Sequence, residues 1–348
     1  HSNNDGVEST VNTTQSDEHE RRQESQATSK IPSTINIITT SDATTNPGYR
    51  RPVDTHTIVT QITDSTDKRQ YYTPDKDGDN ITYHVNHADA IGGNLVTEKQ
   101  EGHIRISGCN PNGIKAQNLQ SHLQHSKDLD IDIQGYSEVN TNFVLNKTAQ
   151  AFYELPKRMD PTSRPTWCSS EYECEGAFKP GGTGIVTNGT PASRIKETRK
   201  DPLGRWTCQI LDGEKDKDVA IICVYQCCTP SKKTGMKTAY KQQKVLLSKM
   251  NRRNTDPRTN FKIDLKQFVK DIQKKYTNIR PIILGDWNEE CKGTAASMDI
   301  CHEFGLVNIF ERMHPEHEKF NTYNRGASII DFALAPPEIA DIVSNFVY

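Results

Sequence analysis

One short stretch of the sequence combines a buried strand with side chains that could do chemistry. Residues 281–290 read PIILGDWNEE, an apolar run ending at a glycine and followed by Asp286, Trp287 and Asn288. This pattern is typical of a buried strand that stops at a turn. The spacing sends Asp286 and Asn288 to one side and Trp287 to the other, and an acid beside an amide suits the positioning of a water and a phosphate oxygen. An Asx turn after a core strand explains the same residues.

Three other predicted strands also end on side chains that bind metal ions or phosphate. These side chains are Asn110 and Asn112 after the strand at 103–109, Glu138 after the strand at 131–137, and Tyr225 at the end of the strand at 219–225. Each has an ordinary alternative, namely a turn, a surface acid at a strand end, or a core aromatic with its hydroxyl bonded. Found together and in this order, they favour a shared site.

Asp331 is an acid inside an otherwise apolar segment, SIIDFAL at 328–334. Burying an isolated acid costs several kcal/mol unless the acid is paired or hydrogen bonded. The sequence therefore predicts a dedicated partner for Asp331.

Apolar periodicity predicts the elements that position these residues. A helix is expected at 115–127, and a longer one, with Asp264 as its N-cap, carries a core-facing stripe. That stripe is formed by Leu265, Phe268, Val269, Ile272 and Tyr276. Other predicted segments are strands at 184–187 and 206–211 around a turn at 201–204, a helix at 294–304, and strands at 306–310 and 328–334. This alternation predicts one α/β domain at 101–348.

Composition separates this domain from the residues before it. The 348-residue chain is 33% hydrophobic with a mean hydropathy of -0.77, which is low for a chain that is globular throughout and indicates a polar tail. Residues 1–30 contain only three apolar side chains, too few to offset the entropy of the chain. We expect residues 1–100 to be disordered or weakly structured.

Charge, cysteines and hydropathy limit the environment of the chain. A formal net charge of -2 predicts no nucleic-acid partner by itself and leaves a local basic face open. The 9 cysteines lack paired zinc spacing and no signal peptide is seen, so we expect reduced thiols in an intracellular protein. No apolar run approaches the ~20 residues of a membrane span. Because the chain starts at His1 rather than Met, we expect it to be a piece of a longer protein.

As an ordered set, these segments resemble the endonuclease/exonuclease/phosphatase family over residues 102–348. The matching segments are 106–113, 133–138, 181–186, 201–206, 222–225, 282–288, 320–323 and 328–332. Within the family the chain looks most like the endonuclease domains of non-LTR retrotransposons, on the segments TAYKQQ at 238–243 and LVNIF at 306–310 followed by His314 and Pro315. The resemblance implies a four-layer α/β/β/α sandwich of two mixed sheets with helices outside, and an active site at one edge.

The resemblance also implies roles in metal and substrate binding. Glu138 would bind the divalent ion, Mg²⁺ or Mn²⁺, with help from Asn110, and an oxygen-only shell with retained waters suits Mg²⁺. Asn112, which stands where many family nucleases have Asp, and Arg205, from the segment at 201–206, would contact substrate.

The catalytic roles implied by the resemblance fall on four residues. Tyr225 would hydrogen-bond the scissile phosphate, Asp286 would activate the attacking water, and Asn288 would hold the phosphate oxygens. Asp331 would orient a histidine, as a buried carboxylate orients the imidazole in other hydrolases. The implied function is that of a metal-dependent phosphodiesterase, a DNA endonuclease that nicks target DNA by water attack on a backbone phosphate.

The C-terminal end departs from the family pattern. The family ends with an Asp-His pair after the segment that contains Asp331, whereas this chain stops at Tyr348, and its last histidines, His302, His314 and His317, all lie upstream. We expect a truncated sequence that is weakly active and marginally stable. The alternative is a catalytically incomplete remnant that binds nucleic acid or a partner without cleavage.

Basic residues between the predicted strands could form a rim beside the site. They fall into three groups: Arg194, Lys196, Arg199 and Lys200; Lys232, Lys233 and Lys237; and Lys249, Arg252, Arg253 and Arg258. Such a rim would suit a nucleic-acid backbone, because phosphate contacts dominate its affinity. Ordinary solvated loops explain the same charges equally well.

The substrate does not follow from the family alone, because relatives cleave DNA, RNA tails, inositol phosphates or sphingomyelin. The likeness to mobile-element endonucleases implies a DNA partner, a nuclear location and a fused reverse transcriptase outside this chain. Leu and Phe are not concentrated in one predicted loop, which makes a membrane lipid less attractive as a substrate.

Overall fold

The computed structural model describes residues 102–348 except 214–216, 231–236, 253–255, 318–319, 321, 323–327 and 347. It also describes Lys99 and the backbones of three strands nearer the N-terminus. No helix in this described part of the chain is long and apolar enough to cross a membrane.

The first sheet is mixed and has the strand order β1-β4-β5-β7-β6. Its strands are β1 (Ser33–Ser41), β4 (His103–Asn110), β5 (Ile133–Ser137), β6 (Arg164–Cys168) and β7 (Thr183–Thr187). Strands β4 and β5 run parallel, and the other neighbours are antiparallel. Asn110 therefore ends β4 at the same edge at which Glu138 follows β5.

The second sheet is also mixed and has the order β12-β13-β11-β10-β9-β8. Its strands are β8 (Ile195–Lys200), β9 (Trp206–Leu211), β10 (Val219–Tyr225), β11 (Arg280–Asp286), β12 (Val307–Asn308) and β13 (Asp331–Ala335). Only β10 and β11 are parallel, so Tyr225 and Asp286 end neighbouring strands at one edge. Strands β2 (Tyr72–Pro74) and β3 (Ile81–Tyr83) form a separate antiparallel pair.

The two sheets pack face to face through an apolar core. The first sheet contributes Ile106, Ile133 and Ile185, and the second contributes Ile221, Cys223, Ile282, Leu284 and Ala333. Ser137 Oγ donates a hydrogen bond to Val224 O at 2.8 Å, which joins β5 to β10 directly. The edge that carries the polar side chains is therefore the open end of a close-packed interior.

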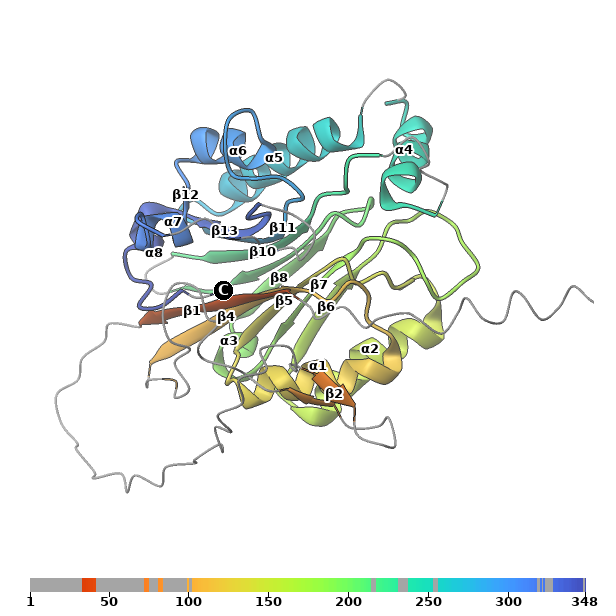
Figure 1. Cartoon of the computed structure of the whole chain (residues 1–348), viewed down its shortest axis with the longest axis horizontal. Helices are drawn as coiled ribbons and strands as arrows, with labels where there is room; N and C mark the ends of the chain where they lie inside the picture. Colours follow the sequence, from red (N-terminus) through yellow and green to blue (C-terminus); the bar gives the residue numbers. More distant parts are fainter. Residues whose placement is uncertain are drawn as a thin grey trace, which may run out of the picture. The chain divides into compact units, whose positions relative to one another are not determined.

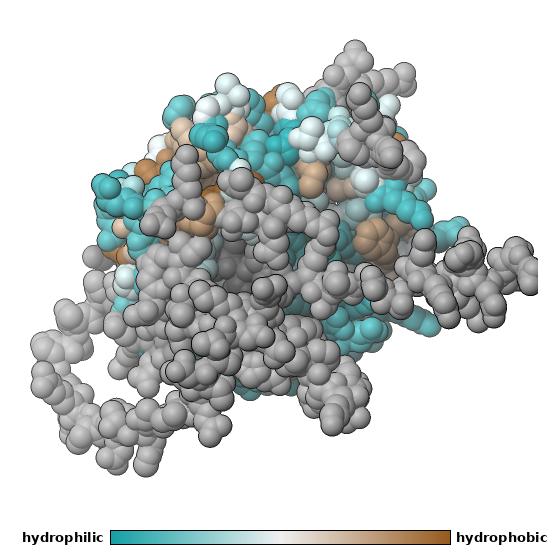
Figure 2. Space-filling model, viewed as in Figure 1, coloured by the Kyte–Doolittle hydropathy of each residue, from teal (hydrophilic) through white to brown (hydrophobic). Residues whose placement is uncertain are grey.

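Helices cover the outer faces of both sheets (Figure 1). Helices α1 (Ala116–Asp128) and α2 (Asn146–Met159) pack on the first sheet, and α5 (Pro257–Lys275) and α6 (Ala296–Phe304) pack on the second. The shorter helices are α3 (Gly189–Ser193), α4 (Ala239–Lys249), α7 (Ile309–Met313) and α8 (Pro337–Ala340). The predicted four-layer sandwich is confirmed. Near α5 and α6, Figure 2 shows hydrophobic residues scattered among hydrophilic ones.

The predicted stripe on α5 is confirmed, but its N-cap is wrong. Leu265, Val269 and Ile272 are buried against the second sheet. The cap is Asp256, whose side chain accepts hydrogen bonds from two backbone N–H groups of the first turn, while Pro257 occupies the first helical position. Asp264 lies inside the helix and binds two arginines instead.

The segment predicted as a strand at 306–310 is a strand only at Val307–Asn308 and turns into a helix at Ile309. Only Val307 and Asn308 pair with β13, and α7 begins directly after them. The Asn308 side chain accepts from the backbone N–H groups of Phe310 and Glu311, and this local bonding starts a helix in a segment with strand-like composition.

The N-terminal boundary of the domain stays a prediction. Strand β1, from the region expected to be weakly structured, pairs antiparallel with β4, from Ser33 opposite Asn110 to Ser41 opposite His103. Residues 1–32 lie outside the described residues.

Candidate active site

Three of the predicted catalytic residues lie side by side because of strand register. Tyr225 on β10 is paired with Asp286 on β11, and Asp286 is paired with Asp331 on β13. Side chains of paired residues point to the same face of a sheet. Two residues away on each strand, Cys223, Leu284 and Ala333 face the interior between the sheets. Tyr225, Asp286 and Asp331 therefore continue that inner face at its open end.

Asn110 connects these residues to the first sheet. Its Nδ2 donates to Glu138 Oε2 at 2.9 Å and to Asp286 Oδ2 at 2.8 Å, across 176 residues of sequence in the second case. Its Oδ1 accepts from the backbone N–H of Asn112 at 2.8 Å. The Asn110 amide therefore links Glu138, the other predicted metal ligand, to Asp286, the residue predicted to activate the water.

Asn288 is held against the carboxylate of Asp286. Its backbone N–H donates to Asp286 Oδ1 at 2.9 Å, and its Nδ2 donates to Asp286 Oδ2 at 3.1 Å and to Gln226 O at 2.7 Å. Trp287 between them is fully buried and stacks on Phe332, so the expected alternation of the side chains is confirmed. An Asx-type turn is also present, as the alternative interpretation of this segment predicts.

Backbone strain accompanies the polar side chains. Glu138, Asn288 and Asn112 have positive φ angles of 52°, 48° and 49°, a region that is uncommon for non-glycine residues and costs of order 1–3 kcal/mol at each position. Such strain persists only where the surroundings fix the chain, and it clusters at functional sites.

Hydrogen bonds to the next loop fix the chain directly after Glu138. Val139 N–H donates to Gly182 O at 3.2 Å, and Asn140 N–H donates to Gly181 O at 2.8 Å. Gly182 has a φ of 86°, and a Cβ there would lie 2.7 Å from the carbonyl oxygen of Cys168. Only glycine fits this close approach, which explains the paired glycines at 181–182.

Electrostatics at the site are dominated by buried acids. Burial, followed by the negative charges of Asp331 and Glu138, raises the pKa of Asp286 well above its usual range. Burial raises the pKa of Asp331 to about 7, opposed by a hydrogen bond from the Thr322 hydroxyl. The largest effects that lower the two pKa values are hydrogen bonds from neutral groups, namely Asn288 and Asn110 for Asp286 and Thr322 for Asp331. The cluster therefore favours a proton or an added cation.

Tyr225 keeps its proton. Burial and the charges of Glu138, Cys228 and Asp286 raise the pKa of its phenol well above the usual value. A protonated phenol is a hydrogen-bond donor, which is the state that an anionic phosphate requires.

The residues present fit a divalent ion that retains waters. Within the described ranges, no group of three or more His, Cys, Asp or Glu side chains is arranged to hold a metal by itself. Mg²⁺ is usually held by one or two carboxylates, several waters and substrate phosphates, and Glu138 supplies a carboxylate. To ligate the same ion, Asn110 would have to turn its amide oxygen, which accepts from the backbone N–H of Asn112, toward Glu138. The buried acids Asp286 and Asp331 nearby also favour a cation.

The dedicated partner predicted for Asp331 is found for only some of its polar atoms. Its backbone N–H donates to Thr322 Oγ1 at 3.2 Å, and its backbone carbonyl accepts from the Tyr348 hydroxyl at 2.8 Å. Its Oδ1 is buried and has no hydrogen-bond partner among the residues that the structure describes. His314 does not supply this partner, because its Nε2 is hydrogen bonded to Phe346 O at 3.0 Å.

The two predicted substrate-binding residues differ in their placement. Asn112 is exposed next to Asn110. Arg205 is 1% exposed and is not brought to the site, because its guanidinium donates to Asp201, Asn260 and Asp264. A direct contact between Arg205 and substrate would require these bonds to break.

Half of the described residues in the predicted basic rim are ion-paired, namely Lys196, Arg199, Arg252 and Arg258. Lys196 pairs with Asp212 and Asp218 on the edge of the second sheet, and Arg252 pairs with Asp264. Arg258 lies nearest the site, where it donates to Cys227 O at 2.7 Å and to Asn288 O at 3.3 Å. Lys232, Lys233 and Arg253 fall outside the described residues.

Sequence reasoning missed two groups that touch the site. The Cys228 thiol donates to Asn288 Oδ1 at 3.1 Å, and the backbone N–H of Asp286 donates to Ser137 Oγ at 3.2 Å. Cys228 follows Tyr225 by three residues, so its nearness to the strand end was the available signal. Nothing in the sequence indicated Ser137, since its contact crosses between the sheets.

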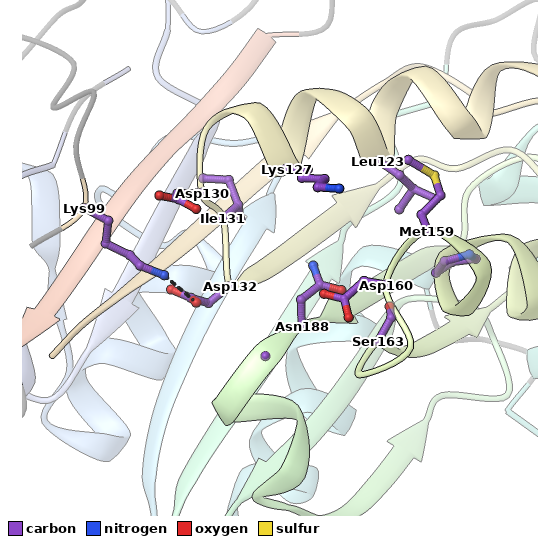
Figure 3. A pocket seen from close by; sticks show the side chains of 12 residues that line it. Lys99, Leu123, Lys127, Asp130, Ile131, Asp132, Met159, Asp160, Ser163 and Asn188 are labelled. Atoms are coloured by element: carbon purple, nitrogen blue, oxygen red, sulfur yellow. Dashed lines mark hydrogen bonds and ion pairs between the residues drawn. The ribbon is translucent and has the colours of Figure 1, made fainter. Parts of the chain in front are cut away.

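A pocket of about 260 Å³ lies elsewhere on the molecule (Figure 3). It is lined by the C-terminal ends of α1 and α2 and by the residues before β5, including Asp132, which bonds Lys99 Nζ at 2.8 Å. Since β5 runs from Ile133 toward Glu138, this pocket and the acidic cluster are at opposite ends of that strand. It contains none of the predicted site residues.

Solved structures that are similar to this chain include nucleic-acid enzymes. No protein-family model matches the chain, and no curated protein matches it. The 3′ phosphatase NExo from Neisseria bound to product DNA hairpin is 17% identical, with 66% of this chain and 85% of that chain covered and a TM-score of 0.42. The AP endonuclease LMAP from Leishmania major is 14% identical, with 67% and 78% covered and a TM-score of 0.46.

An endonuclease/exonuclease/phosphatase family protein from Leptotrichia buccalis is also similar. It is 12% identical, with 70% of this chain and 96% of that chain covered and a TM-score of 0.38. All three TM-scores lie below 0.5, so the function is inferred below from the geometry of the site.

Proposed function

We propose that this chain is a metal-dependent phosphodiesterase that cleaves a nucleic-acid backbone by attack of water. The convergence of Glu138, Asp286 and Asp331 with Asn110 and Asn288 at the open end between two sheets carries the proposal. Asp286 and Asp331 are buried, and the charge of Glu138 raises the pKa of both; such perturbed acids are costly for stability, which favours a role in catalysis.

Each residue of the site has a distinct role in this proposal. Glu138 and Asn110 hold Mg²⁺ or Mn²⁺, which when bound neutralises charge on the phosphate. Asp286 accepts a proton from the attacking water, and it can do so only when ionised. Neutralising the charge of Glu138 with a cation removes one source of the repulsion that raises the pKa of Asp286.

Substrate positioning falls to neutral donors. The Asn288 amide and the Tyr225 phenol can both donate to non-bridging phosphate oxygens, and neither adds negative charge. Asn112 is exposed next to Asn110 and is available to a neighbouring phosphate. Asp331 orients a proton-donating group through its unbonded Oδ1, and we propose a histidine for that group.

DNA is the proposed substrate because one side of the site is suited to polyanions. Helix α4 begins beside Tyr225, where Ala239 packs against the Tyr225 and Cys227 side chains. The N-terminal end of a helix carries partial positive charge, and Lys237 and Lys241 are next to it. A phosphate backbone leaving the site along α4 would therefore meet positive charge.

A finer assignment rests on the sequence resemblance alone. We propose that the chain comes from a mobile element of the non-LTR retrotransposon type, with a reverse transcriptase in the longer protein and a nuclear place of action. The sequence of the transcript past Tyr348 tests this, and a continuation without a reverse transcriptase would refute it.

Nicking of supercoiled plasmid tests the enzymatic proposal. The chain is used in excess over plasmid, because weak activity is expected, with Mg²⁺ or Mn²⁺ and with EDTA. Nicking should require the metal, should be lost in Asp286→Ala, and should be retained in Asp271→Ala, a control on the exposed side of α5. Plasmid binding without metal-dependent nicking would instead support the binding-only alternative.

A further inference from the structure

Three sulfur-bearing side chains lie together at the start of α6, outside the acidic cluster. Cys291 belongs to the loop after Asn288, and Met298 and Cys301 are three residues apart on α6, which places them on one helix face. Cys291 Sγ lies 3.7 Å from Met298 Sδ, and the thiols of Cys291 and Cys301 are hydrogen bonded to each other. Neither cysteine is in a disulfide.

Sulfur contacts of this kind also occur as ordinary packing, but here two thiols and a thioether, one from a loop and two from one face of α6, contact one another. The hydrogen bond from Cys301 lowers the pKa of the Cys291 thiol, although burial acts in the opposite direction. Burial has the opposite effect on the pKa values of Cys109, Cys168, Cys208, Cys223 and Cys227. The acids Glu289 and Glu311 add negative potential at Cys291, which also favours a cation.

We propose that Cys291, Met298 and Cys301 form a binding site for a soft monovalent metal ion, Cu(I). Thiolate and thioether ligands select soft ions, whereas the Mg²⁺ proposed above requires oxygen ligands. A metal–sulfur bond of about 2.3 Å in a trigonal arrangement places two sulfurs about 4 Å apart, close to the separation of Cys291 and Met298. Structural Zn²⁺ requires four ligands, and in the part of the chain that the structure describes no group of three or more His, Cys, Asp or Glu side chains is placed to hold a metal.

Binding would replace the thiol protons of the cysteine pair. Cu(I) would form bonds to the sulfurs of Cys291, Cys301 and Met298, and the thiol protons would be released to solvent. No electron is transferred, so no oxidant or reductant is needed. The bound ion would tie the loop that follows Asn288 to α6.

Competition with a chromophoric Cu(I) chelator tests the site. The reduced full chain is titrated without oxygen against the Cu(I) complex of bathocuproine disulfonate, and the loss of the complex's absorbance gives the Cu(I) taken up. The wild type should bind one equivalent more than Cys291→Ser and Cys301→Ser. Met298→Leu, which conserves core volume, should weaken the binding at that site by about tenfold or more.

Matched controls keep the outcome decisive if one variant is unstable. Cys174→Ser, a half-buried thiol next to Asn142, should bind as many equivalents as the wild type. X-ray absorption of the one-equivalent complex should show sulfur ligands only. Equal Cu(I) uptake by the wild type and by a folded Met298→Leu or Cys291→Ser variant would overturn the proposal, as would competition by Zn²⁺ at similar concentration.

Discussion

Replacing Asp331 by Asn should stabilise the protein at neutral pH. Asp331 is 2% exposed and faces the charge of Glu138, and burial raises its pKa from 3.8 to about 7. The folded state therefore keeps the carboxyl protonated in a pH range where the unfolded chain has lost the proton. The stability associated with this group is fully present below about pH 4 and is lost as the pH rises toward 7.

The size of the effect follows from the same shift. A pKa change from 3.8 to about 7 corresponds to roughly 4 kcal/mol of unfolding free energy at pH 8. An asparagine cannot ionise, so Asp331→Asn avoids this loss and leaves the shape of the side chain unchanged. The variant should match the wild type near pH 4 and exceed it progressively up to pH 8.

Urea unfolding of both proteins at several pH values measures this difference. EDTA is included, because a cation bound beside Glu138 would favour the ionised acid. Asp271→Asn is the matched control, since Asp271 is exposed on α5 and bonds Gln267 Nε2, and its pH trend should equal that of the wild type. An Asp331→Asn advantage that stays constant or shrinks as the pH rises would refute the assignment of a buried, protonated Asp331.

Three further predictions follow from other contacts. Asp201→Asn should destabilise the fold by about 3–5 kcal/mol, because the buried Arg205 loses the carboxylate that its Nε and Nη2 contact at 2.7 and 2.9 Å. Urea unfolding measures this, and an unchanged unfolding midpoint would contradict it. Gly182→Ala should cost about 1–3 kcal/mol by the same assay, owing to its positive φ and the close carbonyl of β6, and wild-type stability would show that the loop adjusts. Lys237→Glu should weaken plasmid binding and reduce the slope of log affinity against log salt concentration by about one. Lys274→Glu, in the last turn of α5, should change neither quantity, and equal effects of the two variants would argue against a DNA path along α4.

Much of the architecture could be predicted because buried strands and helix faces require apolar residues at regular positions in the sequence. The strands β10 and β11 appear as apolar runs because both of their faces are covered, one by the other sheet and one by helices. The stripe on α5 appears because a helix that covers a sheet must present one apolar face. The polar residues that end these strands were visible for the same reason, as interruptions of apolar runs.

Local bonding and long-range pairing were less predictable. Asp264 and Asp256 are both acids near the start of one helix, and only the position of Pro257 and the partners Arg205 and Arg252 distinguish the cap from an ion-paired residue inside the helix. Helix α2 and strand β6 were not predicted, although Phe152 and Trp167 pack together in the first sheet's outer layer.

The sequence by itself determined which residue types stand at the ends of which strands, because strand boundaries are set by local apolar runs and turn residues. Only the tertiary structure decided that Asp286 lies opposite Asp331, that Asn110 bonds both Glu138 and Asp286, and that Arg205 points into the fold. The reason is physical: register and sheet stacking arise from contacts between segments far apart in the chain, and the same contacts decide which charges are buried together and which are paired.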